Sequence, residues 1–148
     1  MNLQLNELTK RYGAKEALKG ISLTVEGGRT LGFLGRNGAG KTTTLRILAG
    51  VFAPDGGSVV YNGAPLDRRA TTVGYLPEER GLYSKVGILD QLTYIGQLKG
   101  MNRSQAKNAA RRCLQEFELE DCAGKPLGTL SKGNQQKIQL VATLISDP

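Results

Sequence analysis

The chain has 148 residues, of which 39% are hydrophobic and 22% charged, and its formal net charge is +7. This length and composition suit one soluble domain with its own core, and no run of 18 apolar residues indicates a membrane span. The sequence has no histidine, which excludes histidine-based acid–base catalysis, and its two cysteines alone cannot complete a zinc site.

The first half of the chain predicts short strands around one helix. Apolar and polar residues alternate in two segments, as in half-buried strands, and a third, mostly apolar segment ends in glycine as a buried strand would. Two later runs, one of them closed by Asn-Gly, also read as strands. The expected strands are 3–8, 21–25, 30–35, 57–63 and 71–77, and the expected helix is 41–50.

The second half, from about residue 84, predicts helices. Three apolar stripes recur at helical spacing, and Ser104 is a candidate N-cap for the second of them. The stripes are Ile88, Leu92 and Ile95, then Ala106, Ala109, Ala110, Cys113, Leu114 and Phe117, and finally Ile138, Val141, Ala142 and Ile145. The residues therefore indicate a mixed β and α/β first half followed by a helical second half.

The stretch GRNGAGKT, from Gly35 to Thr42, matches the phosphate-binding pattern G-x-x-x-x-G-K-[ST] between an expected strand and an expected helix. Its glycines let successive N–H groups point into one concavity, and the helix start adds its positive dipole end. We expect Lys41 to reach the β- and γ-phosphates and the Thr42 hydroxyl to bind Mg²⁺. The alternative is a glycine-rich turn beside a surface lysine. The expected nucleotide-binding residues are Gly35, Arg36, Asn37, Gly38, Ala39, Gly40, Lys41, Thr42 and Thr43.

Two more stretches follow this loop, VGYLPEERGLY from Val73 and LSKGNQQKIQL from Leu130. Together with GRNGAGKTT they resemble, in order and rough spacing, the ATP-binding cassette (ABC) ATPase family over the whole chain. The resemblance implies an α/β P-loop NTPase fold with an N-terminal antiparallel β part and a helical subdomain. It also implies ATP and Mg²⁺ as cofactors, and a second ABC ATPase domain and a transmembrane permease subunit as partners.

Tyr12 lies where the family has its A-loop aromatic, so the resemblance implies that its ring stacks on adenine. A strand-end aromatic that covers the sheet is the alternative. Glu78, followed by Glu79, stands where the family's Q-loop has glutamine. A carboxylate can bind Mg²⁺ as an amide oxygen can, so Glu78 is a candidate metal ligand and, with Lys41, a candidate catalytic residue. A plain surface turn is the alternative for Glu78.

The segment LSKGN stands where the family has its LSGGQ signature. Ser131 is a good N-cap, and Gly133 keeps the backbone accessible. The resemblance implies that Ser131, Gly133 and Asn134 clamp the γ-phosphate held by a second subunit, with Lys132 as an added cation. An ordinary capped helix is the alternative.

The family pattern continues into a Walker B strand, a D-loop and a switch histidine, which these 148 residues do not contain. We therefore expect a partial domain that binds nucleotide without hydrolysing it. Its expected parts are a β and P-loop core with the Q-loop over 1–83, a helical subdomain with the signature over 84–137, and the start of the return to the core over 138–148.

The resulting interpretation is the ATP-binding subunit of an ABC transporter, an ATPase as the complete protein, at the cytoplasmic face of a membrane. The N-terminus has no apolar signal segment, which favours that location. Two other classes stay open: a non-transport ABC ATPase that acts on ribosomes or DNA, and a non-catalytic nucleotide-binding module. We expect no nucleic-acid partner, because the basic residues are scattered and only 5% of residues are aromatic.

Overall fold

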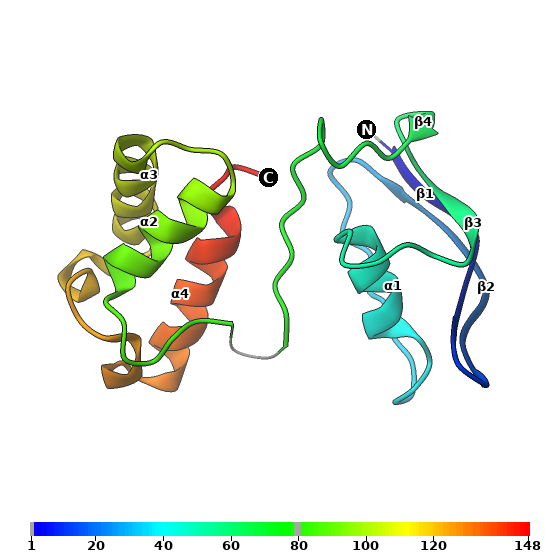
Figure 1. Ribbon diagram of the computed structural model, residues 1–148, viewed down its shortest axis with the longest axis horizontal. Coiled ribbons are helices and arrows are strands. Elements are labelled where there is room, and N and C mark those ends of the chain that lie inside the picture. The colour runs from blue at the N-terminus through cyan, green and yellow to red at the C-terminus, as the bar shows by residue number, and fades with distance from the viewer. Residues whose placement is uncertain (1, 79–80) are drawn as a thin grey trace. The chain divides into compact units, whose positions relative to one another are not determined.

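A computed structural model describes residues 2–78 and 81–148 of the chain (Figure 1). The chain divides into two compact units, one up to Thr71 and the other from Thr72 on. Each unit has its own hydrophobic core. Within the described ranges, no helix is long and apolar enough to cross a membrane.

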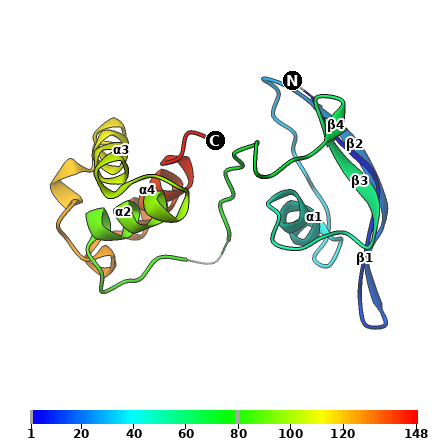
Figure 2. The same ribbon diagram turned by 45° about the horizontal axis from the view of Figure 1, so that its top comes forward.

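The first unit is built on a four-stranded antiparallel sheet with the strand order β2-β1-β3-β4. The helix α1 packs on one face of this sheet (Figure 2). The strands predicted at 3–8, 21–25 and 57–63 are confirmed, and the predicted helix at 41–50 ends slightly earlier than expected. The elements are β1 Asn2–Tyr12, β2 Lys15–Glu26, α1 Lys41–Leu48, β3 Gly56–Tyr61 and β4 Ala64–Pro65.

A bulge lets β1 present both Leu5 and Leu8 to the core. Side chains of a regular strand alternate between its faces, so residues three apart should point in opposite directions. The pairing with β2 is irregular between these two residues, and Glu7 adopts a left-handed φ of 48°. Leu5 and Leu8 are consequently both buried, and they pack with Leu18 of β2 and Ile47 of α1.

The strands predicted at 30–35 and 71–77 are wrong, since neither segment forms a regular element. Leu31 and Leu34 are 49% and 93% exposed, although the apolar pattern predicts burial. A strand exists only through hydrogen bonds to a neighbouring strand. Among the described residues, no strand pairs with either segment, so neither segment forms a strand despite its apolar pattern.

In its described residues the second unit has three α-helices and two short 3₁₀ turns. Its core cluster contains the three predicted apolar stripes apart from Ala106, which is buried as well. The elements are α2 Ile88–Leu98, α3 Arg103–Glu116, η1 Glu120–Cys122, η2 Leu127–Thr129 and α4 Lys132–Leu144. Helices α2 and α3 approach closely where Gly96 faces Ala106. A Cβ atom added at Gly96 would lie 2.7 Å from the Ala106 Cβ, so this contact needs glycine.

The predicted N-cap of α3 is wrong, because Asn102 caps this helix and Ser104 does not. The Asn102 side chain accepts a hydrogen bond from the Gln105 N–H, and the Gln105 side chain accepts one from the Asn102 N–H, both at 2.9 Å. This reciprocal pair is a capping box, which satisfies two backbone donors at once. Gln105 stands three residues after Asn102, and its side chain can accept a hydrogen bond. Lys107 stands three residues after Ser104, and its ammonium cannot accept one.

Replacing Asn102 by alanine should lower the free energy of unfolding by about 1 kcal/mol, because the Gln105 N–H loses its acceptor. The matched Ser104→Ala variant lies in the same first turn but caps nothing, so its effect should stay below about 0.5 kcal/mol. Urea unfolding followed by circular dichroism measures both values. Equal losses in the two variants would contradict the assigned cap.

Candidate functional site

The glycine-rich loop turns sharply and leads directly into α1. Gly38 and Gly40 adopt φ angles of 84° and 86°, a left-handed conformation that side chains disfavour. The Ala39 N–H donates to the Arg36 carbonyl at 3.1 Å and closes the turn. Gly40 then serves as the N-cap position of α1, so the loop delivers the chain to the helix start.

A close contact fixes this helix start to the sheet. A Cβ atom added at Gly40 would lie 2.4 Å from Leu18 Cδ2 and 2.7 Å from the Ala17 carbonyl oxygen, both in β2. The buried Thr44 hydroxyl donates to the Gly40 carbonyl at 3.0 Å and holds the same end of α1 from inside. The loop therefore rests directly on the strand, with no room for a side chain between them.

The Lys41 side chain lies folded back along the loop. Its Nζ donates to the carbonyl oxygens of Gly35 at 2.5 Å and Arg36 at 2.9 Å. The ammonium is therefore held beside the loop backbone and does not extend into solvent. No acidic residue stands in the first turn of α1 to offset this charge.

The first turn of α1 offers backbone donors that no side chain caps, and these N–H groups carry the positive end of the helix dipole. Thr42 is exposed in this turn and Thr43 is half-buried. An ammonium, several amides and a hydroxyl, without a carboxylate, fit the phosphates of a nucleotide. In the described part of the chain, no three His, Cys, Asp or Glu residues gather as metal ligands.

Tyr12 ends β1 and pairs with Lys15 at the start of β2. Its side chain is 49% exposed, so part of the ring is open to a ligand. Ala17, whose carbonyl faces Gly40, lies two residues beyond Lys15, about 7 Å at the usual rise per strand residue. Tyr12 and the phosphate loop are thus both supported by the β1–β2 hairpin of the first unit.

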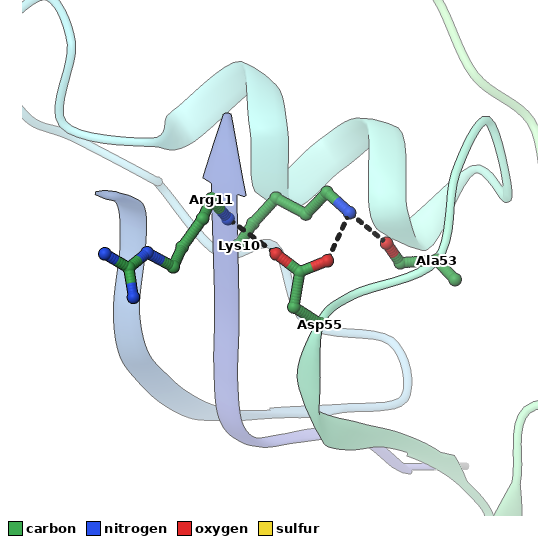
Figure 3. Close-up of polar contacts among 4 residues, drawn as sticks. All are labelled: Lys10, Arg11, Ala53 and Asp55. Atoms are coloured by element: carbon green, nitrogen blue, oxygen red, sulfur yellow. Dashed lines mark hydrogen bonds and ion pairs between the residues drawn. The ribbon is translucent and has the colours of Figure 1, made fainter. Parts of the chain in front are cut away.

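A polar cluster of Lys10, Arg11, Ala53 and Asp55 lies near the end of β1 (Figure 3), and no motif in the sequence indicates it. Asp55 Oδ1 accepts a hydrogen bond from Lys10 Nζ, and Asp55 Oδ2 accepts one from the Arg11 N–H, each at 2.7 Å. The Lys10 hydrogen bond, and then the Arg11 N–H, hold the pKa of Asp55 below its usual value. The carboxylate is therefore charged at neutral pH, and it joins segments that lie far apart in the sequence.

The signature segment begins α4 in the second unit. Ser131 is the N-cap, as predicted, and its hydroxyl accepts a hydrogen bond from the Asn134 N–H at 3.3 Å. Gly133 is exposed, and a Cβ atom there would meet nothing within 4 Å. Lys132 is exposed and Asn134 is half-buried. This helix start therefore presents open backbone, a hydroxyl and one cation on the surface.

Glu78 is exposed in an irregular segment of the second unit, and its neighbour Glu79 lies outside the described residues. Beside Glu78, mainly apolar residues line a cavity of about 230 Å³. Lys99 lies in its wall, where burial lowers the pKa of the ammonium and Nζ donates to Ser146 Oγ at 2.9 Å. The lining includes Tyr75, Leu76, Pro77, Ile95, Lys99 and Ala142.

The predicted site residues thus fall into two sets. The loop residues and Tyr12 lie in the first unit, whereas Glu78 and the signature residues lie in the second. Sequence analysis missed Leu18, which limits the residue at the helix start to glycine, and Asp55, which binds the end of β1. Only their contacts in three dimensions reveal them.

Comparison with known proteins decides the family. The family model described as ABC transporter matches residues 18–148. The chain belongs to the ABC transporter family. An uncharacterized ABC transporter ATP-binding protein of Bacillus subtilis is 40% identical over 99% of this chain, and Nod factor export ATP-binding protein I of Paraburkholderia xenovorans is 35% identical over 99%. The chain spans about half the length of these relatives, 49% of each.

Solved structures of ABC transporter subunits share this fold. An ATP binding subunit of an ABC transporter has a TM-score of 0.79 at 25% identity and covers 100% of this chain and 63% of its own. An ATP-binding cassette in its ADP conformation has a TM-score of 0.82 at 20% identity, with 100% and 66% covered. The predicted fold class, an ABC ATPase-like P-loop fold with an antiparallel β part and a helical subdomain, is confirmed.

Replacing Gly40 by alanine should destabilise the protein more than replacing Gly38, by at least about 1 kcal/mol, and should weaken nucleotide binding. Both glycines have a left-handed φ, but only a Cβ at Gly40 strikes β2, since a Cβ at Gly38 meets nothing within 4 Å. Urea unfolding compares the two variants. If the two variants lost equal stability, the requirement for glycine at position 40 would not come from its contact with β2.

Proposed function

We propose that this chain is the nucleotide-binding part of an ABC transporter's ATP-binding subunit, in which ATP binding and hydrolysis drive transport across a membrane. The observation that carries this proposal is the ammonium of Lys41, held by the carbonyls of Gly35 and Arg36 at an uncapped helix start. Membership of the ABC transporter family supports it, and the name of one relative refers to Nod factor export.

In this proposal, ATP binds along the first unit. The Lys41 ammonium turns from the loop carbonyls to the β- and γ-phosphates, while the loop N–H groups surround the same oxygens. The Thr42 hydroxyl would hold Mg²⁺, which would supply charge neutralisation at the phosphates. The open part of the Tyr12 ring stacks on adenine.

A second ABC ATPase domain completes the site in this proposal. The start of α4 combines the Ser131 hydroxyl, the exposed backbone at Gly133 and the charge of Lys132. Such a combination attracts an anion, here the γ-phosphate held by the other domain. The Asn134 N–H already donates to Ser131, which leaves the Asn134 side-chain amide for the nucleotide.

We place the contact with a transmembrane permease subunit at the cavity beside Glu78, so that the chain works at the cytoplasmic face of the membrane. The apolar lining from α2 and α4 suits a short helix or loop of a partner. Glu78 is exposed, and its carboxylate is of the kind that can bind Mg²⁺. It would then take the place of the family's glutamine.

The 148 residues alone should bind nucleotide without hydrolysing it. The family's water-activating glutamate belongs to the Walker B strand, and loss of a positioned base costs on the order of 10²–10⁴ in rate. Phosphoryl transfer also requires a water to be oriented, which the P-loop by itself does not do.

Lys41→Ala should weaken ATP binding by the chain at least about tenfold, because the charged hydrogen bonds to phosphate are lost. The matched Arg46→Ala variant removes an exposed positive charge from the last turn of the same helix and should keep the affinity within about twofold. Calorimetry measures both. An equal loss would show that overall charge binds ATP and the loop does not. Phosphate release by the unaltered chain should not exceed that of Lys41→Ala.

In the complete protein, Ser131→Ala should lower ATPase turnover about tenfold or more while ATP binding to the monomer is kept, because the proposed clamp acts on nucleotide in the partner. Ser131 also caps α4, so Ser131→Asn is needed beside it: asparagine keeps the cap but removes the hydroxyl. Loss of turnover in the stable Ser131→Asn variant supports the clamp. Normal turnover in the Ser131→Asn variant would show that Ser131 only caps α4 and does not act as a clamp.

A further inference from the structure

Among the residues that the structure describes, the end of β1 has a strand neighbour on one side only. Its pairing with β2 continues to Tyr12 opposite Lys15, whereas its pairing with β3 stops at Thr9 opposite Gly56. The residues after Thr9 therefore form a sheet edge on the β3 side. Backbone N–H groups at such an edge have no sheet partner, and strand ends are poorly ordered unless another group holds them.

One carboxylate takes the place of the missing strand partner. Asp55 Oδ2 accepts the Arg11 N–H at 2.7 Å, and Asp55 Oδ1 accepts the Lys10 ammonium at 2.7 Å (Figure 3). The N–H of Asp55 itself donates to the Thr9 carbonyl at 2.9 Å. A single residue thus binds three successive residues of β1, directly before Tyr12.

A second contact from the same segment reaches the Tyr12 side chain. The Phe52 ring packs edge-on against the Tyr12 ring, with centroids 6.0 Å apart and planes at 89°. The Lys10 ammonium lies 5.6 Å from the Phe52 centroid and donates to the Ala53 carbonyl at 3.0 Å. Residues 52–55 therefore hold Tyr12 both through the preceding backbone and through its ring.

We propose that Asp55 is a positioning residue for the adenine-stacking ring of Tyr12, acting through the Arg11 backbone and, by way of the Lys10 ammonium, through the Phe52 ring. This inference rests on the proposed nucleotide-binding function. Tyr12 is 49% exposed, so its own burial does not fix the ring. A ring that is held before the ligand arrives loses less conformational freedom on binding, which raises affinity without a new contact.

The test compares two probes on the complete protein: ATP, which has an adenine, and inorganic triphosphate, which has only phosphates. Asp55→Ala should weaken ATP binding about three- to tenfold and leave triphosphate binding within about twofold. The double variant with Tyr12→Ala should bind ATP no more weakly than Tyr12→Ala alone, because Asp55 acts through that ring. Asp55→Asn keeps one oxygen acceptor and should recover part of the affinity.

Glu26→Ala is the matched control, because it removes one exposed carboxylate at the opposite end of the β1–β2 pair and should change neither affinity. The inference is overturned if Asp55→Ala binds ATP as the wild type does, if it weakens both probes equally, or if its loss adds to that of Tyr12→Ala. A wild-type protein that binds neither probe refutes the proposed function, and this inference with it. If Asp55→Ala binds ATP normally while Tyr12→Ala binds it more weakly, the positioning role of Asp55 is refuted and the proposed nucleotide-binding function stands.

Discussion

The contact between Gly40 and β2 is the constraint on which the proposed nucleotide site depends. Glycine lets the start of α1 approach Leu18 and the Ala17 carbonyl, and any side chain would push the helix away from the strand. This position decides where the first-turn amides and the Lys41 ammonium lie. Ile47, further along α1, is fully buried in the same core and packs the rest of the helix against the sheet.

The β1–β2 hairpin supports both parts of the proposed nucleotide site. One of its strands carries the Ala17 carbonyl against the loop, and the other ends in Tyr12. The segment that follows α1 returns to this hairpin through Phe52 and Asp55. Close packing therefore connects the start of α1 to the hairpin, and hydrogen bonds connect the segment after α1 to it. A change in the hairpin would alter the phosphate loop and the stacking residue together.

The turn of the glycine-rich loop could be predicted from the sequence because its geometry is set within a few residues, whereas its contact with β2 could not. Lys41 binds carbonyls five and six residues before it, and both left-handed positions are glycines. The segment 30–35 could not be predicted in this way, because a strand also needs a partner strand, which can come from anywhere in the chain. The contacts of Asp55 could not be predicted for the same reason, since Asp55 and Lys10 are 45 residues apart in the sequence. Pattern analysis recognises short-range geometry and misses interactions that the tertiary fold creates.

The starts of the four α-helices in the described residues differ in how their backbone donors and dipoles are compensated. At α3 the capping box of Asn102 satisfies the backbone donors, and at α2 Asp90 in the first turn offsets the helix dipole. At α4 a single hydroxyl, that of Ser131, accepts one N–H at a long 3.3 Å. Of these four helices, α1 alone combines a missing side-chain cap with a first turn free of acidic residues. Its amides and dipole therefore lack a compensating group from the described chain, and a phosphate is the ligand whose charge and oxygens would supply it.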